Sequence, residues 1–263
     1  MLQVSQSKGN ITPRGKFFPF MMPNGQWAEA ITDEQYANVM VIKKEDTVLI
    51  WISLDAIGIS EEFSDEVRSR LSKKFSVPIQ NINLGYTHSH CAPQLGGAVG
   101  RMKSYDAHYL SYVADRIEDV TERCFIQGFS DVEVYVKKAD GSDYYSNRNG
   151  IDKTGDKEIG ILEFRNQKGE VKGLILTMAC HSTVVNFIQS RAIHSDLAGY
   201  LCRGLEQRYG IYPLFILQAA GDMGNRCFRK GNDYRELIRI GDGLLKQMEH
   251  IAVEEKLAVN QIQ

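Results

Sequence analysis

The amino-acid sequence predicts an α/β protein with a mixed β-sheet core flanked by helices and an active-site cleft at the carboxyl ends of its strands. Apolar runs of strand length alternate with longer amphipathic stretches, which indicates strands joined by helices. Two of the runs instead flank the Gly-, Asn- and Asp-rich stretch Asp140–Asp156, which favours an antiparallel portion. The chain contains no internal repeat and no long linker, so we expect residues 1–263 to form a single domain.

Six short runs rich in aliphatic and β-branched residues predict the strands. Each is short enough to be a strand rather than a buried helix. They are Thr47–Leu54, Ile82–Tyr86, Val132–Val136, Ile159–Phe164, Gly173–Ala179 and Leu214–Leu217.

Four amphipathic stretches predict helices, and the third has the clearest ends. Ser195 can cap this helix, Asp196 complements the positive end of its dipole, and Gly210 can end it. The four are Glu61–Phe75, Tyr105–Cys124, Asp196–Tyr209 and Asp233–Glu254.

Composition favours a globular protein that acts on a small molecule. The 263 residues are 43% hydrophobic and 24% charged, close to the average for globular domains. With 31 basic and 33 acidic side chains the net charge is only −2, which argues against a nucleic-acid partner. Nothing in the sequence indicates an oligomeric state.

Cysteine usage and hydropathy favour a cytoplasmic location. The five cysteines are odd in number and scattered, and none forms a C-x-x-C pair, which fits a reducing compartment. No run approaches the roughly 18 apolar residues of a membrane-spanning helix. The first ten residues lack the apolar core of a secretion signal.

Four predicted strands are each followed by a residue that can bind a metal or transfer a proton. Ligands bind at the carboxyl ends of strands in open α/β sheets, so parallel strands would bring these residues to one cleft. In chain order they are Asp55, the pair His88 and His90, His181, and Asp222.

The histidines predict a metal site. Four of the six, His88, His90, His181 and His194, follow strands or precede a helix. On an extended segment His88 and His90 would share one face, which suits two ligands, or one ligand and one proton carrier. Neutral imidazoles combined with carboxylates suit zinc or another divalent metal.

Three alternatives stay open at this point. An isolated Asp or His at a strand end can be purely structural. Cys91 and Cys180 adjoin histidines and could supply a thiolate ligand or a catalytic Cys–His pair, although small buried residues fit them better.

Seven segments, in chain order, resemble motifs in the catalytic region of the neutral/alkaline (non-lysosomal) ceramidase family. They cover nearly the whole chain as far as Asn225. The segments are Ile11-Thr12-Pro13 (the family's ITP), Tyr36–Asp55 (ARALVL…SLD), Tyr86–Pro93 (THTHSGP), Asn147-Arg148 (NR), Ala179–Thr183 (HPT), Ser195–Tyr200 (SD-x-x-GY) and Gln218–Asn225 (GD-x-SPN).

This resemblance implies a zinc-dependent amidase in which His88 and His181 bind the metal, while His90 and Arg148 line the active site. Zinc lowers the pKa of a bound water to about 7. On this hypothesis His90 transfers a proton to the leaving amine and Arg148 stabilises the oxyanion, in the hydrolysis of an amide bond.

Departures from the family motifs shape the remaining expectations. The family completes its metal site with a later Glu and Tyr that have no match in this chain, and its active-site Ser falls at Gly224. We therefore expect His194 as third ligand, with Asp222, a candidate catalytic residue, or Asp55 beside the metal. The shorter chain leads us to expect a small N-acyl compound as substrate.

Two other functions compete with the amidase. A ligand- or metal-binding domain that has lost turnover would also tolerate Gly224 and the missing ligands. A metallophosphoesterase fits less well, because the chain has no early D-x-H and no late G-H-x-H motif.

Overall fold

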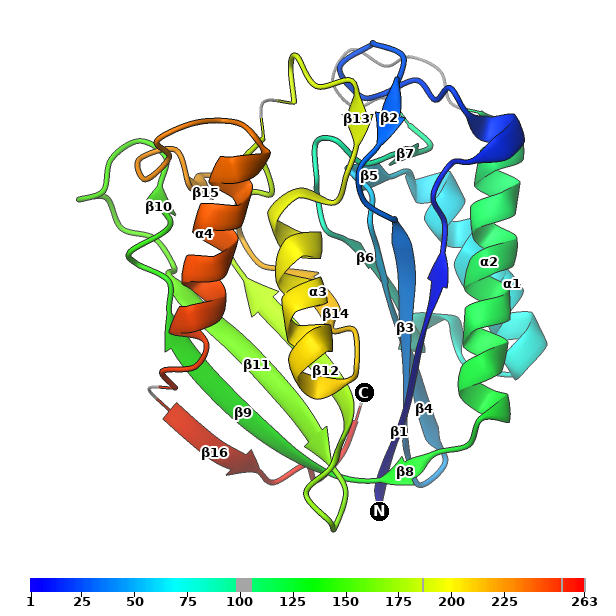
Figure 1. The fold of residues 1–263 in the computed structure, drawn as a ribbon. Helices are drawn as coiled ribbons and strands as arrows, with labels where there is room; N and C mark the ends of the chain where they lie inside the picture. Colours follow the sequence, from blue (N-terminus) through cyan, green and yellow to red (C-terminus); the bar gives the residue numbers. More distant parts are fainter. Residues whose placement is uncertain (98–105, 186, 252, 263) are drawn as a thin grey trace.

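Two five-stranded β-sheets lie side by side, and two helices cover one face of each (Figure 1). The computed structural model describes residues 1–97, 106–185, 187–251 and 253–262. The predicted α/β class, with a mixed sheet core and flanking helices, is confirmed. The four strands that carry chemistry are divided between the two sheets rather than lying in one.

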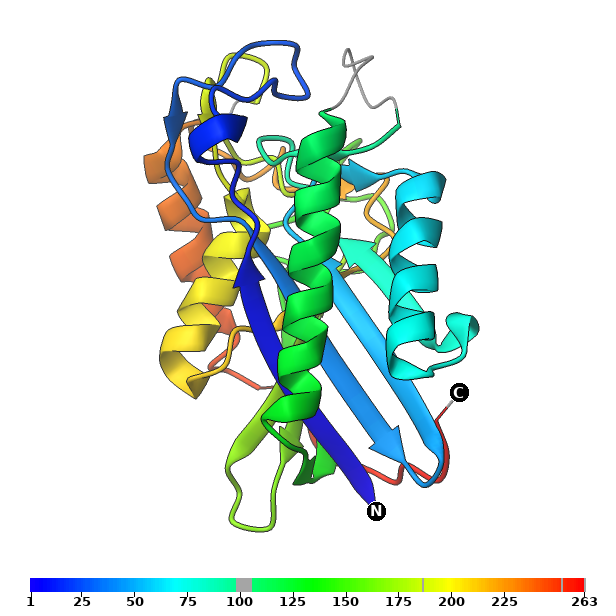
Figure 2. The ribbon, with the colours of Figure 1, turned by 90° about the vertical axis from the view of Figure 1, so that its right-hand side faces the viewer.

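The first sheet has the strand order β6-β4-β3-β1-β8. β1, β3 and β4 are antiparallel neighbours, whereas β4 and β6 run parallel. Helices α1 (Glu61–Phe75) and α2 (Ala107–Ile126) cover its outer face (Figure 2). The strands are β1 (Leu2–Asn10), β3 (Tyr36–Lys44), β4 (Thr47–Leu54), β6 (Ile82–Tyr86) and β8 (Ser130–Asp131).

The second sheet has the strand order β14-β12-β11-β9-β16, with only β12 and β14 parallel. Its antiparallel pair β9 and β11 flanks the Gly- and Asn-rich stretch as predicted. Helices α3 (Asp196–Tyr209) and α4 (Tyr234–Gln247) pack together on one face. The strands are β9 (Glu133–Asp140), β11 (Glu158–Arg165), β12 (Val171–Met178), β14 (Leu214–Leu217) and β16 (Val253–Leu257).

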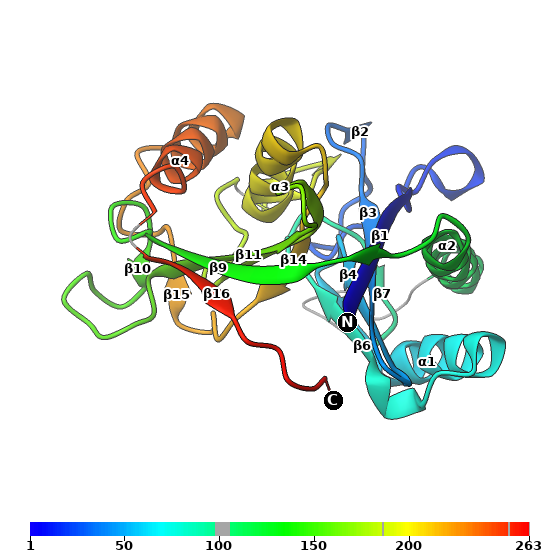
Figure 3. The ribbon, with the colours of Figure 1, turned by 90° about the horizontal axis from the view of Figure 1, so that it is seen from below.

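The inner face of the first sheet packs against the second sheet. In β4, Ile50 and Ile52 point to the helices, whereas Leu49 joins a cluster shared with the second sheet. Burial on both faces explains why this strand is almost continuously apolar. Ser53 Oγ donates a hydrogen bond to Phe215 O of β14 at 2.7 Å. Figure 3 shows, from below, β14 reaching the first sheet on the side opposite α1 and α2.

Three two-stranded ladders connect the loops at the carboxyl ends of the parallel strands. One of them, between β2 and β13, joins a loop of the first sheet to the segment before α3. The pairs are β2 (Ala30–Ile31) with β13 (Ala192–Ile193), β5 (Gly58–Ile59) with β7 (Gln94–Leu95), and β10 (Ser146–Asn147) with β15 (Met223–Gly224). Short 3-10 turns, Gly15–Phe17 and Ile79–Asn81, complete the elements.

The predicted helix Asp233–Glu254 is wrong at its end. The helix stops at Gln247, and Val253–Leu257 is an edge strand paired with β9. Its VEEKL sequence carries charged side chains that are exposed, as suits a sheet edge.

Two further expectations need correction. Ser195 is the N-cap residue of α3, but its hydroxyl makes no cap hydrogen bond and instead accepts one from Arg203 Nη1 at 2.8 Å. The predicted start of the second helix, Tyr105, lies outside the described residues.

Among the described residues, no helix combines the length and apolar character that crossing a membrane requires. All five cysteines are free, and Cys227 alone is exposed.

Candidate metal centre

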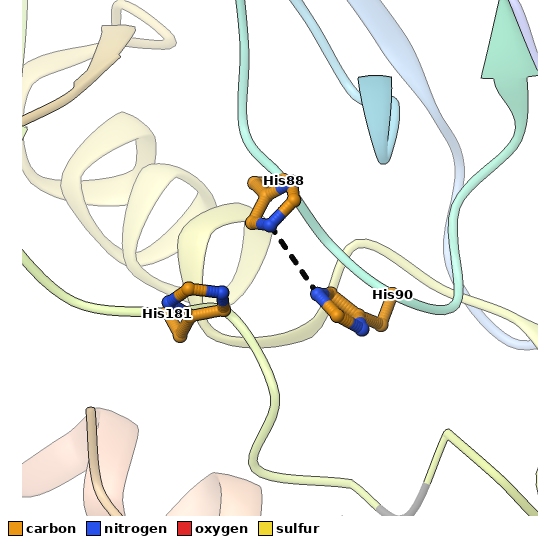
Figure 4. Close-up of side chains that lie close together, drawn as sticks. All are labelled: His88, His90 and His181. Atoms are coloured by element: carbon orange, nitrogen blue, oxygen red, sulfur yellow. Dashed lines mark hydrogen bonds between the residues drawn. The ribbon is translucent and has the colours of Figure 1, made fainter. Parts of the chain in front are cut away.

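Three histidines converge where β6 and β12 end. The ligand nitrogens of His88, His90 and His181 all lie within 4.8 Å of one another (Figure 4). His88 and His90 come from the first sheet and His181 from the second. In the part of the chain that the structure describes, these histidines form the one group of three potential metal ligands that lie this close together.

The loop after β4 orients His88. His88 N donates to Ala56 O at 3.0 Å, and its ring Nδ1 lies 2.6 Å from Ile57 O. Because a carbonyl only accepts, Nδ1 carries the proton and the Nε2 lone pair is free to bind a cation. His88 has a φ of 57°, so the expectation of an extended segment is wrong here.

The loop after β14 orients His181 in the same way. His181 Nδ1 lies 2.7 Å from Ala220 O, and His181 N donates to Met223 O at 3.3 Å. The two sheets therefore use the same arrangement. A histidine follows one strand of the parallel pair (β6 or β12), and a carbonyl in the loop after the other strand (β4 or β14) orients its ring. In both rings Nδ1 faces a carbonyl oxygen, which leaves Nε2 for a ligand.

His90 completes the group. Its Nε2 lies 3.4 Å from His88 Nε2, and its ring packs against Phe187 with ring centroids 4.5 Å apart. Burial lowers the pKa of His90 to about 3, with further contributions from His88, His181 and Arg148. Burial also lowers the pKa of His181. Both rings are thus kept neutral, which is the form that binds metals.

The chemistry of the donors suits zinc or a similar divalent ion, and one nitrogen–nitrogen distance matches it. Two nitrogens that bind one tetrahedral zinc at about 2.0–2.1 Å are separated by roughly 3.3–3.4 Å, and the His88–His90 distance is 3.4 Å. Burial raises the pKa of the Cys91 and Cys180 thiols, and neither thiol belongs to the group of potential ligands found among the described residues. Three imidazoles remain as the candidate ligands.

His194 lies outside this group. Its side chain is buried, its Nδ1 accepts from Asp196 N at 3.2 Å, and its Nε2 has no hydrogen-bond partner. Its backbone instead contacts the loop of the first two histidines, because Ser89 Oγ donates to His194 O at 2.9 Å. The structure therefore brings His90, rather than His194, to His88 and His181.

Arg148 and Asp222 flank His181. Arg148 follows β10, whose ladder with β15 brings it beside the loop after β14, and its Nη2 donates to Gly221 O. Asp222 lies in the chain between Ala220 and Met223, whose carbonyl oxygens face His181. Its Oδ2 accepts a hydrogen bond from Asn147 Nδ2 at 2.7 Å. The Arg148 charge lowers the pKa of both His90 and His181, so it acts on the centre.

Asp55 is buried away from the three histidines. Its Oδ2 accepts from Tyr36 N at 2.9 Å, which extends the β3–β4 ladder by one residue. Burial raises the pKa of this carboxyl to about 7.

Sequence reasoning missed the groups that orient the ligands. The carbonyls of Ile57 and Ala220 carry no residue-type signal, because any backbone can supply them. Phe187, which packs on His90, lies in a loop with no recognisable motif.

Solved structures similar to this chain include ceramidases. A neutral ceramidase from Pseudomonas aeruginosa and a ceramidase in complex with C2 each match with a TM-score of 0.78 and 20% identity. Each match covers 95% of this chain but only 44% of the ceramidase. No protein-family model and no curated protein matches. The resemblance deduced from the motifs is thus confirmed at the level of the fold.

The geometry favours His90 over His194 as the third candidate ligand. We expect His90→Ala to weaken zinc binding by more than about tenfold, because it removes a nitrogen 3.4 Å from His88 Nε2. His194→Ala should retain the metal, although it lowers the melting temperature by opening a buried cavity. Metal analysis after purification without chelator, with folding checked by circular dichroism, measures both. Loss of metal in folded His194→Ala but not in His90→Ala would contradict this assignment.

Asp55 predicts a pH dependence of stability. Its ordinary pKa of 3.8 is raised to about 7 by folding, so between these values the folded chain holds a proton that the unfolded chain has lost. The free energy of unfolding therefore falls as the pH rises, by about 2 kcal/mol between pH 5 and 7 from this group. Urea denaturation at several pH values should show that Asp55→Asn lacks this decline. Parallel curves for the two proteins would refute the prediction.

Proposed function

We propose that this chain is a metal-dependent hydrolase that cleaves the amide bond of a small N-acyl compound, with zinc or another divalent ion held by His88, His90 and His181. One observation carries the proposal: histidines from two sheets place their ring nitrogens within 4.8 Å of one another. The ceramidase-like fold supports an amide as the bond that is cleaved, since ceramide is an N-acyl lipid.

The residues of the chain divide the work as follows. A bound divalent ion would supply Lewis acidity and a hydroxide nucleophile at neutral pH. Arg148, whose charge reaches His90 and His181, stabilises the negative charge that develops on the carbonyl oxygen. The exposed Asp222 carboxylate, held by Asn147, accepts the proton that the attacking water loses and passes it to the leaving amine. His90 serves as a ligand in this scheme and not as the proton carrier.

A groove between the two sheets is consistent with a substrate that carries an apolar acyl group. It has a volume of about 710 Å³ and lies between the edge strands β6 and β14, with Leu84, Tyr86, Ile216 and Leu217 in its lining. The ring of Tyr86, which lines the groove, lies 5.9 Å from the His88 ring, and this places the groove next to the histidine loop. Such a volume accommodates a small acyl compound.

A second candidate function is metal or ligand binding without turnover. In the ranges that the structure covers, no carboxylate joins the three histidines. Gly224 also places no side-chain nucleophile beside His181, which lies next to it. Activity assays on the metal-loaded protein distinguish the two functions.

The hydrolase is tested with a library of N-acyl amides and a matched library of phosphoesters. We expect amide hydrolysis that a chelator abolishes and that added zinc restores. Arg148→Ala should lower kcat by about 10²–10³ with the metal retained, because it removes oxyanion stabilisation. Arg116→Ala, on the outer helix α2, is the matched control and should leave kcat unchanged. Turnover of the phosphoesters alone would reject the amidase, and no turnover of either with metal bound would favour the binding function.

Gly224 offers a test of the space beside Arg148. A Cβ there would lie 3.4 Å from Arg148 Cδ and 3.7 Å from His181 Cβ, both ordinary contacts. We therefore expect Gly224→Ser to melt within about 3 °C of the unchanged protein. Gly141→Ser should be strongly destabilised, because its Cβ would overlap the buried Tyr145 ring. Equal losses in both variants, measured by thermal denaturation, would contradict this.

A further inference from the structure

The first residues of α3 connect the two loops that carry the histidines. His88 and His90 belong to the first sheet and His181 to the second, so their spacing depends on contacts that cross between the loops. The segment His194–Ala198 makes such contacts on both sides.

On the side of the first sheet, the backbone of His194 holds both neighbours of His90. Ser89 Oγ donates to His194 O at 2.9 Å, and His194 N donates to Cys91 O at 3.1 Å. Ser89, Cys91 and His194 are all almost fully buried, so water cannot replace these bonds easily. This loop is therefore fixed to the start of α3.

On the side of the second sheet, Asp196 holds the chain that follows His181. Its Oδ1 accepts from Val184 N at 2.9 Å and its Oδ2 accepts from Val185 N at 3.1 Å. Ser182, directly after His181, accepts from Ala198 N at 2.9 Å. One short segment thus fixes the positions of both loops.

The backbone of Asp196 indicates that its carboxylate is needed. Asp196 has a φ of 49°, which residues other than glycine generally avoid, and it is 1% exposed. If this position only had to begin the helix, glycine would adopt this φ at a lower energetic cost. Both carboxylate oxygens accept backbone N–H groups instead, and Oδ1 also accepts from Leu197 N at 2.7 Å.

We propose that Asp196 is a positioning residue that sets the distance between His181 and the pair His88 and His90, and thereby the metal affinity of the centre. The inference rests on the proposed metal centre. Asp196 contacts none of the three histidine rings and acts through the loop that contains Val184 and Val185.

The test measures binding of Co²⁺ alone to the full chain, by competition with a chelator and by the visible spectrum of the bound ion. Asp196→Asn keeps the size of the side chain, but its amide NH₂ cannot accept from a backbone N–H. We expect Co²⁺ to bind about 10–100-fold more weakly, with an altered spectrum. Asp106→Asn is the matched control, because Asp106 also accepts two backbone N–H groups at a helix start, but in α2, which covers the outer face of the first sheet. It should leave affinity and spectrum unchanged.

Two more variants keep the inference testable if Asp196→Asn does not fold. Asp196→Gly relieves the φ of 49° but lacks the carboxylate, and Ser182→Ala removes only the acceptor of Ala198 N. Both should weaken Co²⁺ binding, the second by less. Unchanged affinity and spectrum in the folded variants would overturn the role of Asp196 and leave the metal centre intact. If the unaltered chain binds no Co²⁺, the metal centre fails, and the role of Asp196 fails with it.

Discussion

The candidate centre depends on parallel strand pairing in two separate sheets. β4 and β6 form one parallel pair, and β12 and β14 form the other. In each pair one strand ends near a histidine, and the carbonyl of the neighbouring loop fixes which ring nitrogen keeps its proton. The two histidine loops belong to different sheets, and these sheets pack against each other through a shared apolar cluster. Ligand geometry is therefore a property of the interface between the sheets.

Burial of polar groups around the centre has two effects. It depresses the pKa of His90 and His181, which keeps their lone pairs available at neutral pH. It also makes each loop hydrogen bond costly to lose, since a buried backbone N–H without an acceptor finds no water. Buried hydrogen bonds hold the histidine loops, and the short polar side chains of Ser89 and Ser182 take part in two of them.

Strong local patterns made parts of the fold predictable from the sequence. The bounds of β4, β6, β14, α1 and α3 match the prediction, because each combines a clear period with a clear stop. β1 was not predicted, since its polar residues gave no strand period. At the centre, the H-x-H spacing singled out His88 and His90, which the structure brings together with His181. The sequence could not show how the two rings are oriented, because His88 adopts a left-handed backbone conformation that its residue type does not encode.

Because the candidate ligands come from two sheets, a metal bound there would also contribute to stability. His88 follows a strand of the first sheet and His181 a strand of the second. An ion held between them would therefore join the two halves of the molecule non-covalently. Anything that binds only the docked arrangement stabilises it in proportion to the logarithm of the free ligand concentration. The supply of divalent metal would then set the lifetime of the folded chain against heat and proteases, in addition to its capacity for chemistry.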